Sequence, residues 1–161
     1  MSSNDLNILK WWIDASHHVH NDLKGHTGAT MSMGQGSVYS TSIKQKLNTK
    51  SSTESELVGI DEVLPQVLWT NYFLKEQGYD IQDTVVYQDN KITILLEKNG
   101  QLSSSKCTKH IQARYYFIKQ CIDRKQVSVQ HCPTEDMIAD FFTKPLQGKK
   151  FKEFRDLIMN L

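Results

Sequence analysis

Two glutamates stand two residues apart in KSSTESELVGIDEV, where an apolar helical pattern begins. The positions on the same helical face as Glu56 are apolar: Ile60, Val63 and Val67. The corresponding positions after Glu54 are mostly polar, so the pattern directs Glu56 toward a core and Glu54 outward. Capping is the alternative role for either residue, Ser51 with Glu54 or Thr53 with Glu56. A carboxylate aimed at a core needs a cation to offset its lost hydration, which makes Glu56 the candidate for chemistry.

Three aspartates stand where they could join Glu56. Asp14 ends an expected strand at 10–15, and Asp89 ends another at 84–89. Open α/β sheets build their sites at the carboxyl ends of strands, although a lone Asp there is also typical of a helix cap or turn. Asp140 lies in MIADFF, inside an expected short helix where Asp is a poor helix former.

Four carboxylates at one end of a sheet would repel one another unless hard cations neutralised them. An all-oxygen ligand set suits Mg²⁺, with Mn²⁺ as a substitute. Two such ions can activate a water and stabilise a leaving oxygen in phosphodiester hydrolysis. The acid pattern therefore favours a metal-dependent nuclease.

The elements that must position these acids follow from hydrophobic periodicity and turn residues. We expect strands at 10–15, 30–34, 37–43, 84–89 and 127–131, and helices at 53–77, 90–98, 108–124, 133–142 and 149–159. Pro65 either kinks the first helix or divides it. This order predicts a mixed α/β sheet with helices packed on it, in a single domain over 1–161 with a core at about 10–146 and a helical tail at 147–161.

Composition excludes several other classes. Nineteen basic and eighteen acidic residues among 161 give a net charge of +1, which identifies no partner. No apolar run or signal peptide suggests a membrane protein or a secreted one. Three cysteines without CxxC spacing predict reduced thiols rather than a disulfide framework or a zinc site. The loop histidines at 17, 18, 20 and 26 lack a second ligand pair, so a transition-metal site is not favoured.

Four motifs in register resemble one family. They are SSTESEL before an apolar helix, YQDN, TKHIQARYYFIK and PTEDMIADFFTKPL. Together, from about Trp12 to Leu146, they resemble the ribonuclease H domain of copia-type retrotransposon polyproteins. The resemblance implies a ribonuclease H-like fold: a five-stranded mixed sheet, strands one to three antiparallel, with helices on both faces.

The resemblance also implies an activity, namely endonucleolytic hydrolysis of the RNA strand of RNA–DNA hybrids during reverse transcription. Matched motif by motif, its catalytic and metal-binding acids are Asp14, Glu56, Asp89 and Asp140, with two Mg²⁺ ions as cofactors. The implied partners are the hybrid and a reverse transcriptase domain of the same polyprotein, with no membrane and no small-molecule substrate. The implied location is intracellular, in the cytoplasm within a retrotransposon particle.

An RNA–DNA hybrid would need protein donors as well as metal. Ser16 and Asn90 are candidates for contacting the hybrid near the cut, where 2′-hydroxyl groups distinguish RNA from DNA. A basic cluster at the start of the 108–124 helix is the candidate for phosphate binding, with a solvated charged face as the alternative; it consists of Lys106, Lys109, His110 and Arg114.

Two other functions remain open from the sequence. An integrase-like or transposase-like core also uses carboxylates and magnesium, but four acids fit ribonuclease H better than three. A catalytically inactive nucleic-acid-binding remnant of the same fold is the second alternative.

Overall fold

A five-stranded mixed sheet forms the centre of the protein. The computed structural model describes residues 6–91, 94 and 109–161. The strands are β1 (Ile8–Ser16), β2 (His26–Ser32), β3 (Tyr39–Lys44), β4 (Asp83–Gln88) and β5 (Ser128–His131), in the order β3-β2-β1-β4-β5. Neighbours among β1, β2 and β3 are antiparallel, whereas β4 runs parallel to both β1 and β5. The mixed sheet expected from the sequence is confirmed, including its antiparallel first three strands.

The helices are α1 (Ser52–Glu76), α3 (Lys109–Asp123) and α4 (Gly148–Met159), with two 3-10 turns, η1 (Thr134–Asp136) and η2 (Ile138–Phe142). Pro65 is exposed inside α1, and the helix continues past it without dividing. Most of the expected 90–98 helix lies outside the described residues. Among those described, no helix combines the length and the apolar character needed to cross a bilayer.

The prediction of one helix at 133–142 is wrong, because two separate 3-10 turns, η1 and η2, occupy this segment. Met137 has φ −74° and ψ 84°, a non-helical conformation that separates η1 from η2. Its side chain is fully buried in a small apolar cluster with Trp12 and Cys132. Packing of this residue therefore overrides the helical pattern of its neighbours.

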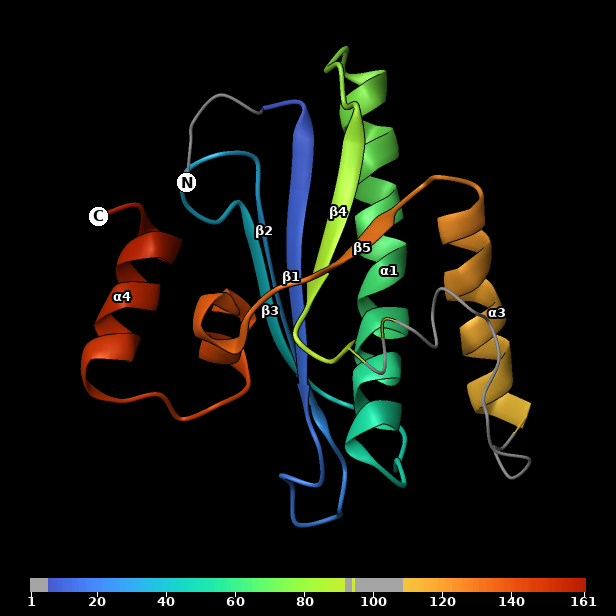
Figure 1. The fold of residues 1–161 in the computed structure, drawn as a ribbon, viewed down its shortest axis with the longest axis vertical. Helices are drawn as coiled ribbons and strands as arrows, with labels where there is room; N and C mark the ends of the chain where they lie inside the picture. Colours follow the sequence, from blue (N-terminus) through green and yellow to red (C-terminus); the bar gives the residue numbers. More distant parts are fainter. Residues whose placement is uncertain (1–5, 92–93, 95–108) are drawn as a thin grey trace.

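The two faces of the sheet carry different cores (Figure 1). On one face, alternate β1 residues Leu9, Trp11 and Ile13 pack in the main core with apolar residues of α1 and α3. On the other face, Trp12 stacks on Tyr87 with ring centroids 5.2 Å apart and packs with apolar residues of η2 and α4. Because side chains alternate along a strand, Asp14 shares its face with Trp12 and so points toward the 3-10 turns.

The strand β2 begins earlier than expected, at His26 instead of residue 30. Its first half contains Gly28, where an added Cβ would lie 2.8 Å from the Phe142 Cβ and 3.0 Å from the Ala139 carbonyl oxygen. This close approach of η2 requires a residue without a side chain. The strand therefore lacks the bulky alternation that would reveal it in the sequence.

Candidate active site

Asp14 lies near the end of β1 and is 2% exposed. Thr143, which follows η2, donates a hydrogen bond from its hydroxyl to Asp14 Oδ2. Burial raises the pKa of Asp14 to about 6, in spite of the lowering by the Lys144 ammonium and by the Thr143 hydrogen bond. The acid is therefore held in a position where its charge is costly.

Glu56 projects from the first turns of α1 onto the sheet and is 6% exposed. Its Oε2 is buried and has no hydrogen-bond partner among the residues that the structure describes. Burial raises the pKa of Glu56 well above its ordinary value, and the charges of Asp14 and Asp89 raise it further. The inward orientation expected for this glutamate is observed.

Glu54 has the capping role instead. Its backbone amide donates to Ser51 Oγ at 3.2 Å, and its Oε2 accepts from the Lys50 backbone amide at 2.7 Å. These bonds satisfy free amides at the start of α1. Ser55, on the next position, lies 2.9 Å from His17 Nδ1, so the histidine loop also helps to fix the start of the helix that carries Glu56.

Asp89 follows the last residue of β4. The preceding side chain, Gln88, is fully buried and donates from Nε2 to the Ile13 carbonyl oxygen at 2.8 Å. This bond joins the end of β4 to β1 next to Asp14. Thr134 Oγ1 donates to Asp89 Oδ2 at 3.4 Å, which connects Asp89 to η1.

The three acids Asp14, Glu56 and Asp89 meet at one point. Each offers a carboxylate oxygen, and these oxygens lie within 4.8 Å of one another. They come from β1, α1 and the end of β4, respectively, so only the folded chain brings them together. A cluster of oxygen ligands this tight is suited to a hard divalent cation, and the unpartnered Glu56 oxygen is consistent with one.

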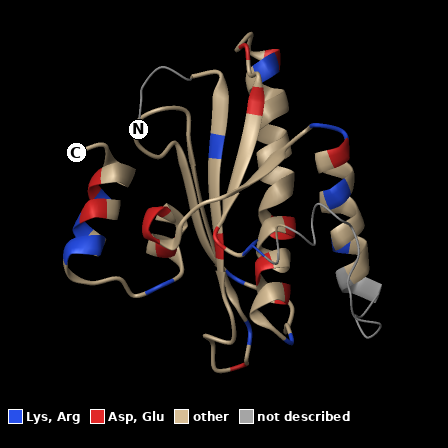
Figure 2. Cartoon of the chain, viewed as in Figure 1, with Lys and Arg blue, Asp and Glu red and all other residues tan. Residues whose placement is uncertain are grey.

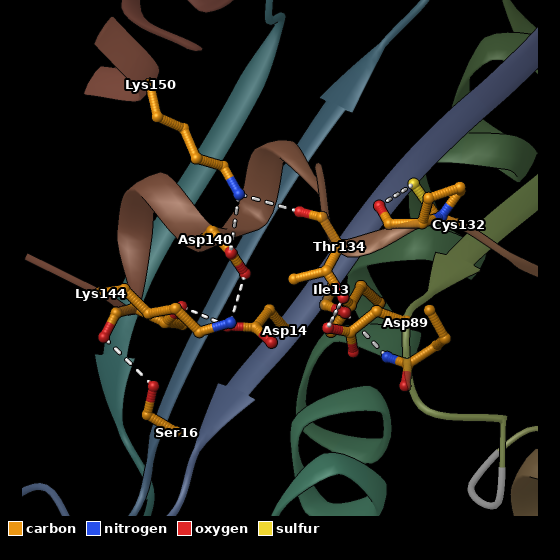
Figure 3. Close-up of polar contacts among 12 residues, drawn as sticks. Ile13, Asp14, Ser16, Asp89, Cys132, Thr134, Asp140, Lys144 and Lys150 are labelled. Atoms are coloured by element: carbon orange, nitrogen blue, oxygen red, sulfur yellow. Dashed lines mark hydrogen bonds and ion pairs between the residues drawn. The ribbon is translucent and has the colours of Figure 1, made fainter. Parts of the chain in front are cut away.

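Asp140 lies close by but takes part in a different set of contacts (Figure 3). It is 2% exposed in η2, and its Oδ1 accepts from Lys144 Nζ at 2.6 Å. The same ammonium lies 3.7 Å from Asp14 Oδ2, between the two carboxylates. A second lysine, Lys150 of α4, has its Nζ 3.7 Å from Asp140 Oδ2. The structure thus joins Asp140 to Asp14 through a lysine rather than placing it in the three-acid cluster.

The described candidates for nucleic-acid binding lie on different elements and do not form one cluster as the three acids do. Ser16 ends β1 and donates from Oγ to the Thr143 carbonyl oxygen at 3.2 Å, beside the acids. The carbonyl of Asn90 accepts from the Ile94 amide at 3.1 Å, directly after Asp89. Arg114 of α3 forms an ion pair with Asp61 of α1. Lys106 lies outside the described residues, and Lys109 and His110 begin α3, where only the backbone is described.

Sequence reasoning missed the role of the residues after Asp140. From the sequence, Thr143 and Lys144 were considered only as part of the motif PTEDMIADFFTKPL. In the structure, both residues contact the acids directly. The spacing held a clue, because Lys144 follows Asp140 by four residues, close enough in a compact turn for the side chains to pair. Figure 2 shows basic residues on the segment before α4 and at its start.

The chain is similar in sequence and in fold to known proteins. The Pol polyprotein of transposon TNT 1-94 from Nicotiana tabacum, described as retrovirus-related, is 32% identical over 152 residues, which are 94% of this chain and 11% of the relative. Among solved structures, LC11-RNase H1 isolated from compost has a TM-score of 0.57 at 16% identity, over 84% of this chain and 92% of that one. No protein-family model matches the chain.

The chain has the ribonuclease H fold and is related to the Pol polyproteins of transposons. The resemblance to a copia-type ribonuclease H domain is thereby confirmed. This ribonuclease H-like domain also superimposes on part of the protease-reverse transcriptase of prototype foamy virus, with a TM-score of 0.52 at 13% identity, over 94% of this chain and 19% of that one. LC11-RNase H1 has been solved in complex with an RNA/DNA hybrid as well; that structure has a TM-score of 0.54 at 16% identity and covers 82% of this chain and 91% of that one. The match to TNT 1-94 spans only about a tenth of that polyprotein's length.

Proposed function

We propose that this domain is a metal-dependent ribonuclease H that hydrolyses the RNA strand of RNA–DNA hybrids. The observation that carries the proposal is the cluster of Asp14, Glu56 and Asp89 oxygens within 4.8 Å on this fold. The complex of LC11-RNase H1 with an RNA/DNA hybrid supports the choice of substrate.

The donor set fits a divalent ion. All three ligand atoms are carboxylate oxygens, and two of the acids are buried. Glu56 Oε2 has no hydrogen-bond partner in the described ranges 6–91, 94 and 109–161. Asp14, Glu56 and Asp89 would hold Mg²⁺ or Mn²⁺, and Asp140 with Asp14 would hold a second ion. Bound there, such ions lower the pKa of a water and neutralise the charge that develops on the leaving oxygen.

The protein residues position the reacting groups. The Gln88 bond to the Ile13 carbonyl and the Thr143 bond to Asp14 fix the carboxylates before substrate arrives. We propose that Ser16, the last residue of β1, and Asn90, two residues after β4, contact the sugar–phosphate backbone beside the cut. Cleavage would leave a 3′-hydroxyl and a 5′-phosphate.

We also propose that the domain acts next to a reverse transcriptase domain. The relation to TNT 1-94 and the match within the foamy virus protease-reverse transcriptase support this partner. Within such a polyprotein the hybrid would be made and degraded by neighbouring domains.

The test uses an RNA–DNA hybrid with an end-labelled RNA strand, incubated with Mg²⁺ or with EDTA. We expect cleavage by the wild-type chain only with metal, and a loss of at least 100-fold in Asp89→Asn, which removes one charged ligand. Asp123→Asn is the matched control, because this acid of α3 is exposed and, within the described part of the chain, forms its ion pair with Lys119 four residues away.

Three substrates separate the alternatives. Cleavage of the hybrid but not of duplex DNA or single-stranded RNA supports ribonuclease H. Metal-dependent cleavage of duplex DNA instead would favour an integrase-like core. Binding of the hybrid without any cleavage would favour an inactive remnant.

A further inference from the structure

Lys144 occupies the space between two of the four acids. Its Nζ is 2.6 Å from Asp140 Oδ1 and 3.7 Å from Asp14 Oδ2 (Figure 3). The side chain is half-buried, and its backbone amide donates to the Asp140 carbonyl oxygen at 2.9 Å. Both ends of the residue are therefore fixed to the segment that carries Asp140.

This ammonium divides the acids into two unequal groups. Asp14, Glu56 and Asp89 form a cluster in which Glu56 Oε2 accepts no hydrogen bond from the described part of the chain. Asp14 and Asp140, by contrast, already share a cation that belongs to the chain. Asp14 is common to both groups, so a cation on one side of it affects what can bind on the other.

We infer that Lys144 is an internal cation that takes the place of one divalent ion between Asp14 and Asp140 when no substrate is bound. This inference rests on the proposed function. In the free protein, only the cluster of Asp14, Glu56 and Asp89 then remains available to a divalent ion. Lys144 must leave Asp140 before that acid can become a ligand, and a phosphate of the hybrid is the anion that would draw the ammonium away.

The electrostatic reason is simple. An ammonium and a divalent ion repel, and two acids that already hold a cation have little negative charge left to attract another. An internal ammonium also needs no loss of translational freedom to bind, because the chain already holds it at the site. Lys144 is therefore expected to exclude the second ion at moderate concentrations of free metal.

Lys150 offers a matched comparison. Its Nζ is 3.7 Å from Asp140 Oδ2, but it also donates to the Thr134 carbonyl oxygen at 3.0 Å and lies 5.0 Å from the centre of the Phe154 ring. It contacts one of the two acids, not both. Removing it changes the net charge by the same amount as removing Lys144 and leaves Lys144 in place.

The test is a titration of the full chain with Mn²⁺ in the absence of nucleic acid, with bound and free ion distinguished by electron paramagnetic resonance. We expect one ion per wild-type chain. Lys144→Met should bind a second ion at least tenfold more tightly than the wild type does. Lys150→Met and the charge-conserving Lys144→Arg should each retain a single ion, and circular dichroism would check that every variant is folded.

The inference is overturned if Lys144→Met binds Mn²⁺ with the wild-type stoichiometry and affinity. It is also overturned if Lys150→Met gains the second ion to the same degree, or if no variant binds an ion. Hybrid cleavage measured on the same samples keeps the two proposals apart. A second ion gained by Lys144→Met without cleavage by the wild type contradicts only the ribonuclease activity, whereas wild-type cleavage with unchanged ion binding contradicts only the role of Lys144.

Discussion

Replacing Asp14 with asparagine should make the metal-free protein more stable at neutral and alkaline pH. Asp14 is almost completely buried, and its carboxylate faces other acids. An asparagine has nearly the same shape and carries no charge, and its side-chain oxygen can still accept the Thr143 hydrogen bond. The substitution therefore removes mainly the cost of a buried negative charge.

The size of the effect follows from the pKa. The pKa of Asp14 is about 6 in the folded chain against 3.8 for the free group. The folded state thus binds the proton more tightly, so wild-type stability falls as pH rises from about 4 to about 6 and then levels off. The difference between the two pKa values corresponds to about 3 kcal/mol. For a chain of this length that is a rise in Tm of roughly 6–12 °C in Asp14→Asn.

The assay is thermal unfolding of both proteins in EDTA at pH 8 and at pH 3.5. The Tm of Asp14→Asn should exceed that of the wild type at pH 8 but not at pH 3.5, where the wild-type Asp14 is itself neutral. Adding Mg²⁺ at pH 8 should reduce the difference in Tm between the two proteins, because the ion would stabilise the wild type. A variant that is less stable than the wild type at pH 8, or equally stabilised at both pH values, would refute the idea that Asp14 is held at an electrostatic cost.

Two further substitutions test the elements that support the site. Gly28→Ala places a Cβ 2.8 Å from the Phe142 Cβ and should lower the free energy of unfolding by about 1–3 kcal/mol, as measured by chemical denaturation. Because η2 must move to make room, the variant should also lose activity in the hybrid cleavage assay. A fully active variant as stable as the wild type would contradict the close packing. Glu54→Ala removes the bond to the Lys50 amide and should cost about 1 kcal/mol of stability with little change in activity. An activity loss as large as that of Asp89→Asn would show that the wrong glutamate had been assigned to the site.

The helical period of α1 was enough to distinguish its two glutamates. Glu56 shares a face with Ile60 and Val63, which are both buried, so periodicity alone predicts that it points inward. Glu54 lies off that face and caps the helix together with Ser51, which was one of the two roles considered for it from the sequence. Where an element repeats one pattern over many residues, its orientation can be read from the sequence.

The surroundings of Asp140 could not be predicted in the same way. A regular helix was expected there, but the conformation of Met137 is set by packing beneath Trp12, a residue 125 positions away in sequence. The pairing of Lys144 with Asp14 is likewise a long-range contact. Local patterns carry no information about such contacts, so the spacing of Lys144 after Asp140 could suggest a pair between these two residues but not the approach of Lys144 to Asp14.

The order of the site residues along the chain has a consequence for biosynthesis. During translation, the segments bearing Asp14, Glu56 and Asp89 leave the ribosome well before Thr143 and Lys144. A nascent chain that had folded only through β4 would hold three neighbouring acids without their lysine and would leave Trp12 uncovered by Met137 and Ile138. Docking of residues 134–144 would then be the last event that completes the candidate site.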